Sequence, residues 1–202
     1  NGPCNASDRY IFSGIKGQIL MLIRDTTKRI LFRCRKEIKI IVPVREPVAR
    51  NISMFFQGLT FWTSDYIKNF ERETRHADIN WLWQVFNTMF DHQYCDNWFD
   101  KEIKRFTGID IFQHPFDIES GFMILRNGKY SILLIRTEDL EKNIDTINSF
   151  TGKTIVLNRI NDGSSKWYSC IYYKFKQTMN ENSPSILKTR NGIIAKHFGY
   201  KK

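Results

Sequence analysis

The residues best suited to bind a phosphate lie where an apolar run meets a helix-like segment. The run Ile38–Val44 is rich in β-branched residues, Arg45 follows it, and Pro47 stands where the first turn of a helix would begin. A planar guanidinium matches phosphate oxygens and keeps its charge at any working pH. Ser53 lies eight residues after Arg45. Its hydroxyl would reach the same anion if the helix folds back across the end of the strand.

Structural roles stay open for both residues. Arg45 could cap a backbone carbonyl or pair with Glu46 or a remote carboxylate, and Ser53 could be an ordinary helix serine. In open α/β sheets, however, ligands bind beyond the carboxyl ends of the strands, which is where Arg45 stands. Arg50 faces the same region one turn before Ser53 and is a weaker candidate.

A second stretch that could bind an anion is the loop 162–166, Asp-Gly-Ser-Ser-Lys, which opens a helix-like segment. A helix N-terminus presents free amides and the positive end of the helix dipole to an anion. The alternative is an ordinary loop with a capping serine.

The elements that position these residues mix strands with helices, which is typical of an α/β layer fold. Periodicity and turn residues predict strands over Glu37–Val44, Phe122–Arg126 and Lys129–Ile135, the last two joined by an Asn127-Gly128 turn. They predict helices over Ile15–Phe32, Val48–Leu59, Ile79–Phe90, Asp96–Phe106, Thr137–Phe150, Trp167–Met179 and from Ser183 to Lys188. A loop over Thr60–Asp65 and a polar helix to Arg75 are also expected.

Composition limits the class of protein. The chain has 202 residues, which predicts a single domain over 1–202, and a formal net charge of +10, which favours polyanionic partners. No apolar run approaches the roughly 18 residues of a membrane span. No signal peptide is visible and the four cysteines lack C-x-x-C spacing. We therefore expect reduced, mostly buried thiols and a cytoplasmic location, with peripheral membrane association as the alternative.

Two stretches resemble known families. Residues 44–56, with the sequence V-R-E-P-V-A-R-N-I-S-x-F-F, resemble the 3′-phosphate-binding element of carbohydrate sulfotransferases that use 3′-phosphoadenosine 5′-phosphosulfate (PAPS). Ser165-Lys-Trp-Tyr-Ser169 is similar to the K-W-Y-S signature of a bacterial family described as putative capsular polysaccharide synthesis proteins. The segments Phe90–Ile103 and Ala195–Phe198 look like that family too.

The resemblance implies a fold, a reaction and a set of binding residues. It implies a P-loop-NTPase-like sulfotransferase fold, with a parallel central sheet flanked by helices. The reaction would move a sulfuryl group from PAPS to a carbohydrate hydroxyl, with a polysaccharide or glycolipid acceptor and no nucleic acid partner. The 3′-phosphate would be held by Arg45 and Ser53, with Arg50 and Lys166 as further contacts, and Trp167 or Tyr168 would stack near the adenine.

One part of such an enzyme is not found. A sulfotransferase needs a first strand and a Lys-, Gly- and Ser/Thr-containing loop that cradles the 5′-phosphosulfate. Gly14–Gly17 lacks the hydroxyl residue, and no G-x-x-x-x-G-K-[ST] occurs. We expect the cradle to lie upstream of Asn1, which would leave this chain catalytically incomplete by itself.

The base that removes the acceptor's hydroxyl proton would be one of four residues, His92, His76, Glu71 and Glu73. We favour His92, because it lies in a family-like segment and histidine titrates near neutrality. A structural, hydrogen-bonded role beside Asp91 is the alternative. We expect no metal site around Cys95, since that stretch mixes hard and soft ligands.

Two other functions compete with a sulfotransferase. A non-enzymatic polyanion-binding module, for nucleic acid or acidic glycan, would lose affinity steeply and log-linearly with salt, and no recognised nucleic-acid motif supports it. A glycosyltransferase would usually carry a D-x-D pair, and none occurs here.

Overall fold

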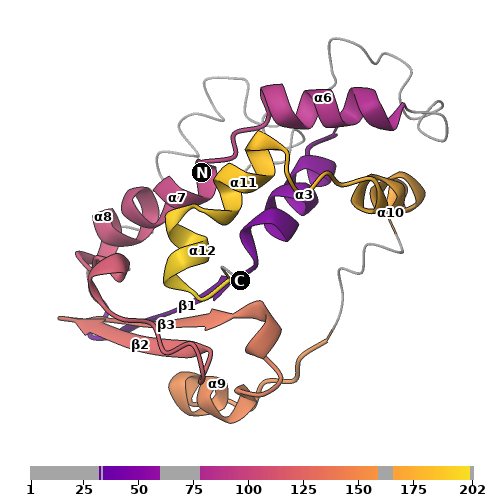
Figure 1. Ribbon diagram of the computed structural model, residues 1–202. Coiled ribbons are helices and arrows are strands. Elements are labelled where there is room, and N and C mark those ends of the chain that lie inside the picture. Colours follow the sequence, from indigo (N-terminus) through magenta and orange to yellow (C-terminus); the bar gives the residue numbers. More distant parts are fainter. Residues whose placement is uncertain (1–31, 33, 60–77, 159–165, 201–202) are drawn as a thin grey trace, which may run out of the picture.

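The computed structural model describes residues 32, 34–59, 78–158 and 166–200, and its centre is a small mixed sheet (Figure 1). The strands are β1 (Ile38–Val44), β2 (Phe122–Asn127) and β3 (Tyr130–Arg136), in the order β1-β3-β2. β1 runs parallel to β3, whereas β2 runs antiparallel to it. The predicted α/β class is therefore confirmed, but the described sheet is mixed rather than wholly parallel because β2 and β3 form a hairpin.

The turn of this hairpin lies one residue later than the sequence suggested. Asn127 pairs with Tyr130, so the two turn residues are Gly128 and Lys129. Gly128 has a φ of 54°, and none of the described non-glycine residues has a positive φ. A positive φ at the first turn position only is typical of a type II′ turn, which places glycine there and leaves Asn127 in the strand.

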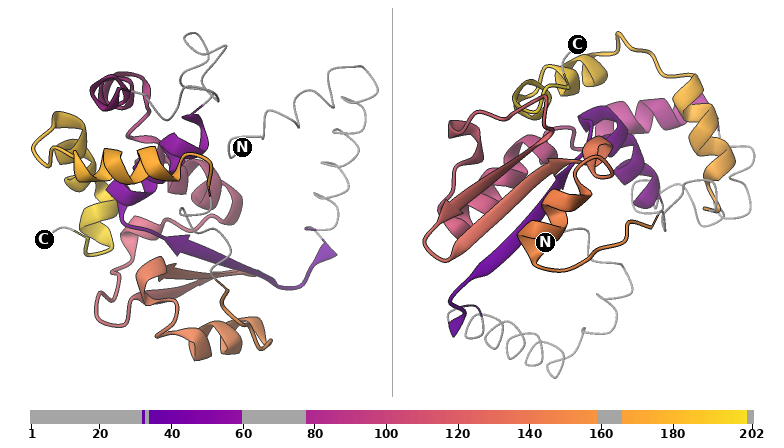
Figure 2. Two further views of the ribbon diagram at one scale, coloured as in Figure 1. Left: turned by 90° about the vertical axis from the view of Figure 1, so that its right-hand side faces the viewer. Right: turned by 90° about the horizontal axis from the view of Figure 1, so that it is seen from below.

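Helices lie on both sides of the sheet and beyond one end of it (Figures 1 and 2). In chain order the described helical elements are α3 (Pro47–Gln57), α6 (Ile79–Met89), α7 (Tyr94–Trp98), the π-helix η2 (Phe99–Lys104), α8 (Arg105–Thr107), the 3-10 turns η3 (Ile111–Gln113) and η4 (Thr137–Asp139), α9 (Ile144–Thr151), α10 (Ser169–Gln177), α11 (Pro184–Arg190) and α12 (Ile193–His197). The predicted starts near Pro47, Ile79 and Pro184 are confirmed, and both prolines stand in a first helical turn.

The predicted helix Thr137–Phe150 is wrong in its first half. Thr137–Asp139 is a 3-10 turn and the α-helix begins only at Ile144. Its end was predicted correctly, since Gly152 follows α9 with a φ of 69°, the left-handed conformation that glycine adopts without strain.

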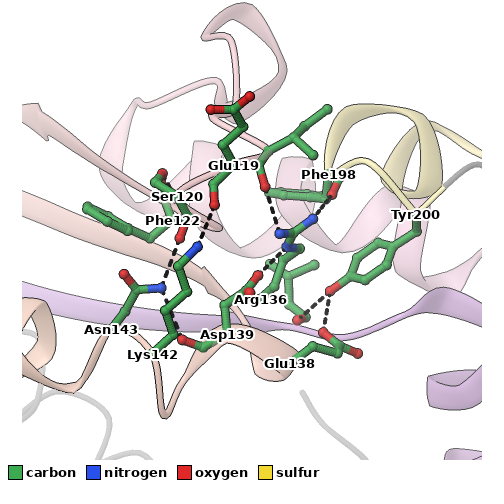
Figure 3. Close-up of polar contacts among 12 residues, drawn as sticks. Glu119, Ser120, Phe122, Arg136, Glu138, Asp139, Lys142, Asn143, Phe198 and Tyr200 are labelled. Carbon is green, nitrogen blue, oxygen red and sulfur yellow. Dashed lines mark hydrogen bonds and ion pairs between the residues drawn. The ribbon is translucent and has the colours of Figure 1, made fainter.

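Side-chain contacts keep residues 137–143 in turns rather than in an α-helix (Figure 3). The Arg136 guanidinium donates to the Asp139 carboxylate through Nε, at 2.5 Å, and to the Ile118 carbonyl through Nη2, at 2.7 Å. Asn143 Nδ2 donates to the Ser120 carbonyl at 2.9 Å. These contacts to the segment before β2 are long-range, so helix periodicity alone could not anticipate them.

Three apolar clusters fill the space between the layers. One face of the sheet packs against α7, η2 and α12, and the other face packs against α9. A third, aromatic cluster joins α3, α6, α10 and α11 beyond the end of β1. α3 thus starts at the sheet and is held in place by a core of its own.

Several expectations fall outside the described residues. They are the helix over 15–32 (apart from residue 32), the loop and polar helix over 60–75, and the loop residues 162–165. Of the described cysteines, Cys95 is buried, but Cys34 and Cys170 are exposed, so the expectation of mostly buried thiols is wrong for these two. Among the described helices, none has the length and hydropathy needed to cross a bilayer.

Candidate anion-binding site

Arg45 directly follows the last residue of β1 and is exposed. The neighbouring Glu46 caps α3, because its carboxylate accepts the backbone N–H groups of Val48 at 3.0 Å and Ala49 at 2.6 Å. That carboxylate is therefore committed to the helix rather than to Arg45. Within the described part of the chain, the Arg45 guanidinium has no hydrogen-bond or ion-pair partner.

The period of α3 divides its residues between the aromatic cluster and an open face. Val48, Ile52, Phe55 and Phe56 are buried in the cluster. The cavity is lined by residues at positions i, i+3, i+4 and i+7, which are Arg50, Ser53, Met54 and Gln57, and Met54 at the edge of this face also packs against the cluster. Burial of one face thus turns the polar residues of the other away from the core.

Arg45 and Ser53 line one cavity of about 410 Å³ at the carboxyl end of β1. Its walls come from the end of β1, the open face of α3, the α7–η2 junction and Ile194 of α12. The structure therefore brings together Arg45, Ser53 and the weaker candidate Arg50, as the sequence predicted. The position also agrees with the rule that ligands bind beyond the carboxyl ends of parallel strands.

Arg50 is held by the wall of the cavity. Its guanidinium lies 5.4 Å from the centre of the Tyr94 ring and donates to Cys95 Sγ. The Cys95 thiol in turn donates to Asn51 Oδ1 at 3.2 Å. Because a cation over an aromatic face is stabilised and ordered, Arg50 presents a fixed positive charge beside Ser53.

Cys95 lines the same cavity but is not a nucleophile. Burial raises the pKa of its thiol to about 11, so the thiol stays protonated near neutral pH. We expect Ellman's reagent at pH 8 to modify as many thiols in the folded Cys95→Ser variant as in the unchanged chain, while the unfolded variant should show one thiol fewer. Loss of a fast-reacting thiol in the folded variant would contradict this assignment.

The structure places His92 behind the cavity wall rather than among the residues that line it. Its ring packs edge-on against Phe86, and Nε2 donates to the Phe86 carbonyl at 2.8 Å. Nδ1 is buried without a hydrogen-bond partner, and burial lowers the pKa of the ring, which keeps it neutral. The other three base candidates lie at 71, 73 and 76, outside the described residues. In the described part, no group of three metal-ligating side chains comes together.

The K-W-Y-S stretch lies on the other side of α3. Trp167 is 54% exposed, and Tyr168 packs 5.6 Å from the ring of Phe56, which faces the aromatic cluster. Among the described residues, neither Lys166 nor Trp167 lines the cavity of Arg45. This stretch therefore packs against the buried face of α3, away from the cavity of Arg45.

The aromatic wall of the cavity, Tyr94, Trp98 and Phe99, was not anticipated from the sequence. Tyr94 and Trp98 stand four residues apart, a spacing that puts them on one face of a helix. That spacing was a usable signal. What it does not say is that α7 lies opposite α3, because this depends on contacts between segments far apart in the chain.

The backbone on either side of Arg45 is tied to the C-terminal segment (Figure 3). The Tyr200 hydroxyl lies 3.0 Å from the Val44 carbonyl and 2.8 Å from Glu138 Oε2, and it shares its proton between them. Glu138 Oε1 accepts the backbone N–H of Glu46 at 3.3 Å. Burial raises the pKa of Tyr200, so the hydroxyl stays a donor. These bonds hold the strand end that presents the guanidinium.

Comparison with known proteins assigns the chain to a family. Residues 73–199 match the family model named NKWYS, described as a putative capsular polysaccharide synthesis protein. The matched region includes α7 and α12, which line the cavity. β1 and α3, which also line it, precede the matched region. The comparisons with curated proteins and with solved structures gave no match. Since more than half of the chain is covered, this protein belongs to the family described as putative capsular polysaccharide synthesis proteins.

Proposed function

We propose that this chain is a sulfotransferase-like domain that takes a sulfuryl group from PAPS and transfers it to a carbohydrate hydroxyl in capsular or surface polysaccharide biosynthesis. The observation that carries the proposal is the shared cavity of Arg45 and Ser53, one at the end of a strand and the other two turns into the next helix. The family's description as polysaccharide synthesis proteins supports a carbohydrate acceptor.

The residues present fit the 3′-phosphate end of the nucleotide. The Arg45 guanidinium is exposed and unpaired in the described structure, and Ser53 and Arg50 line the same cavity. Charge-assisted bonds from guanidinium to phosphate are among the strongest in proteins. Trp98 lines the same cavity and supplies an aromatic ring for the nucleoside, and about 410 Å³ is within the usual range for a small-molecule pocket.

In the proposed reaction PAPS supplies the sulfuryl group, whose bond to the 5′-phosphate oxygen breaks as a bond to the acceptor oxygen forms. Positioning and cationic stabilisation dominate such transfers. Arg45, Ser53 and Arg50 would orient the donor by its 3′-phosphate. His92 stays the proposed base for the acceptor's proton, although its ring does not line this cavity in the structure. Apart from His92, the described residues named here are assigned to the 3′ end of the nucleotide.

The proposal predicts that the chain distinguishes nucleotides by their 3′-phosphate. Adenosine 3′,5′-bisphosphate at one hundred times its dissociation constant should stabilise the fold by about 2.7 kcal/mol, which raises the melting temperature by roughly 5–10 °C for a chain of this size. Adenosine 5′-phosphate at the same concentration should give a much smaller shift. Thermal unfolding followed by circular dichroism measures both, and equal shifts, or none with millimolar bisphosphate, would contradict the proposal.

A polyanion-binding module is the second candidate, and the net charge of +10 favours it. It predicts that affinity follows the number of negative charges on the ligand, whatever their positions. Log-linear loss of affinity for any polyanion with rising salt, without preference for the 3′-phosphate, would support this candidate instead.

A further inference from the structure

The face of the sheet that packs against α9 carries a row of three polar residues. Lys39 of β1 and Arg126 of β2 both pair in register with Ser131 of the central strand β3. Residues paired across neighbouring strands lie on the same face of a sheet. The row therefore places one hydroxyl between two cations, on the face opposite to the cluster that contains α7 and α12.

α9 covers only the other end of this face. Its Ile147 and Phe150 pack against Leu133 and Ile135, which follow Ser131 along β3. Beside the polar row a second cavity, of about 530 Å³, opens between the sheet and α9. None of the described residues lines both this cavity and that of Arg45.

The hydrogen-bond donors of this second cavity are available to a ligand. Ser131 is 7% exposed, and in the described structure its hydroxyl has no hydrogen-bond partner. Arg126 is exposed and likewise unpaired there. The Lys39 ammonium lies 5.9 Å from the centre of the Phe150 ring and 3.9 Å from Glu37 Oε2, an exposed and therefore weak ion pair. The Ser131 hydroxyl is therefore able to bond to a ligand in the cavity that this residue lines.

The rest of the cavity adds acceptors and apolar surface. The carboxylates of Glu37 and Asp145 line it together with the apolar side chains of Phe122 and Ile124. A matching ligand must therefore bring an anionic group, hydroxyl donors and an apolar face in one molecule. A sugar acid has all three. A DNA backbone has closely spaced phosphates without hydroxyl donors, and these two carboxylates would repel it.

We propose that this cavity binds an acidic saccharide. The anionic group of the sugar lies against Arg126 and Ser131, and its ring hydroxyls donate to Asp145 and Glu37. Carboxylate and sulfate groups on the sugar fit the same donors. The site is separate from the nucleotide cavity, so it can hold an acidic polymer whether or not the sulfotransferase proposal stands.

Titration calorimetry on the full chain tests the site with matched probes. A hyaluronan hexasaccharide supplies carboxylates and a heparin hexasaccharide supplies sulfates, while maltohexaose is neutral and a thymidine hexanucleotide is anionic without sugar acids. We expect one or both acidic saccharides to bind. Arg126→Gln should weaken that binding by about tenfold or more, and Ser131→Ala by about fivefold, the values for one charged and one neutral hydrogen bond.

Two control variants make the result specific. Arg105→Gln removes an equally exposed, unpaired cation from α8 and should leave saccharide affinity unchanged. Arg45→Ala should also leave it unchanged, which separates this site from the nucleotide cavity. The inference is overturned if Arg126→Gln behaves like Arg105→Gln, if the hexanucleotide binds as well and is weakened equally, or if neither acidic saccharide binds.

Discussion

Replacing Arg45 by alanine should abolish most of the stabilisation that adenosine 3′,5′-bisphosphate gives to this chain. The guanidinium is exposed and, in the described structure, unpaired, so no protein contact competes with the phosphate for it. Hydrogen bonds that involve a charged group contribute about 1.5–3 kcal/mol each, and an arginine can make two at once to a phosphate. We therefore expect the dissociation constant to rise by about one hundredfold.

Two measurements distinguish a binding role from a structural one. The ligand-free variant should melt within about 1–2 °C of the unchanged chain, because a surface substitution without contacts costs within about 0.5 kcal/mol. Titration calorimetry should show the affinity lost with Arg45→Ala and retained with Arg105→Ala, which removes a cation from α8. If the Arg45→Ala variant still binds the bisphosphate with unchanged affinity, the proposed role of Arg45 in phosphate binding is wrong.

The largest loss of stability is expected from Phe175→Ala. Phe175 is fully buried, stacks on Trp83 with ring centres 3.8 Å apart, and contacts Phe55 and Phe56 of α3. Replacing a buried phenylalanine by alanine costs about 3–5 kcal/mol, since it removes buried apolar surface and leaves a cavity. For a chain of this size the melting temperature should fall by roughly 6–20 °C.

A matched control lies on the same helix. Tyr173 is 47% exposed, so Tyr173→Ala removes an aromatic ring from α10 without opening a cavity and should cost less than about 1 kcal/mol. Urea unfolding measures both variants. Equal losses would mean that the aromatic cluster does not hold α10 against α3 as the packing indicates.

The packing of Phe175 also bears on the candidate site. Phe55 and Phe56 occupy the buried face of α3, and Ser53 stands on its open face. The aromatic cluster therefore sets how α3 is rotated about its own axis. A weakened cluster would displace Ser53 and Arg50 together, although both residues lie on the face of α3 that lines the cavity and Phe175 contacts the other face.

Predictions from local sequence patterns are confirmed where the physical cause of the structure is itself local. The β-branched run of β1, the proline in the first turn of α3 and the left-handed glycine after α9 act within a few residues of the chain. The meeting of Arg45 and Ser53 could be foreseen for the same reason. Only a short connection and two turns of α3 separate them, so few alternative geometries exist.

Predictions failed or went unsupported where the decisive partner is remote in sequence. Thr137 starts a 3-10 turn because Arg136 and Asn143 bond to the segment before β2. Trp167 contacts the neighbouring Tyr168, whose ring packs on Phe56, a residue of the buried face of α3. The residue types made these predictions reasonable, but a residue type does not determine the direction in which its side chain points.

By itself the sequence determined the strand–arginine–proline–helix unit, the α/β class and the polar character of one α3 face, because these follow from dihedral preferences and hydrophobic period. Only the tertiary structure decided that α7 supplies the aromatic wall opposite Ser53, that Tyr200 ties down the end of β1, and that Lys39, Ser131 and Arg126 form one row. Those juxtapositions arise from strand register and core packing between segments far apart in the chain, and such contacts leave no local pattern in the sequence.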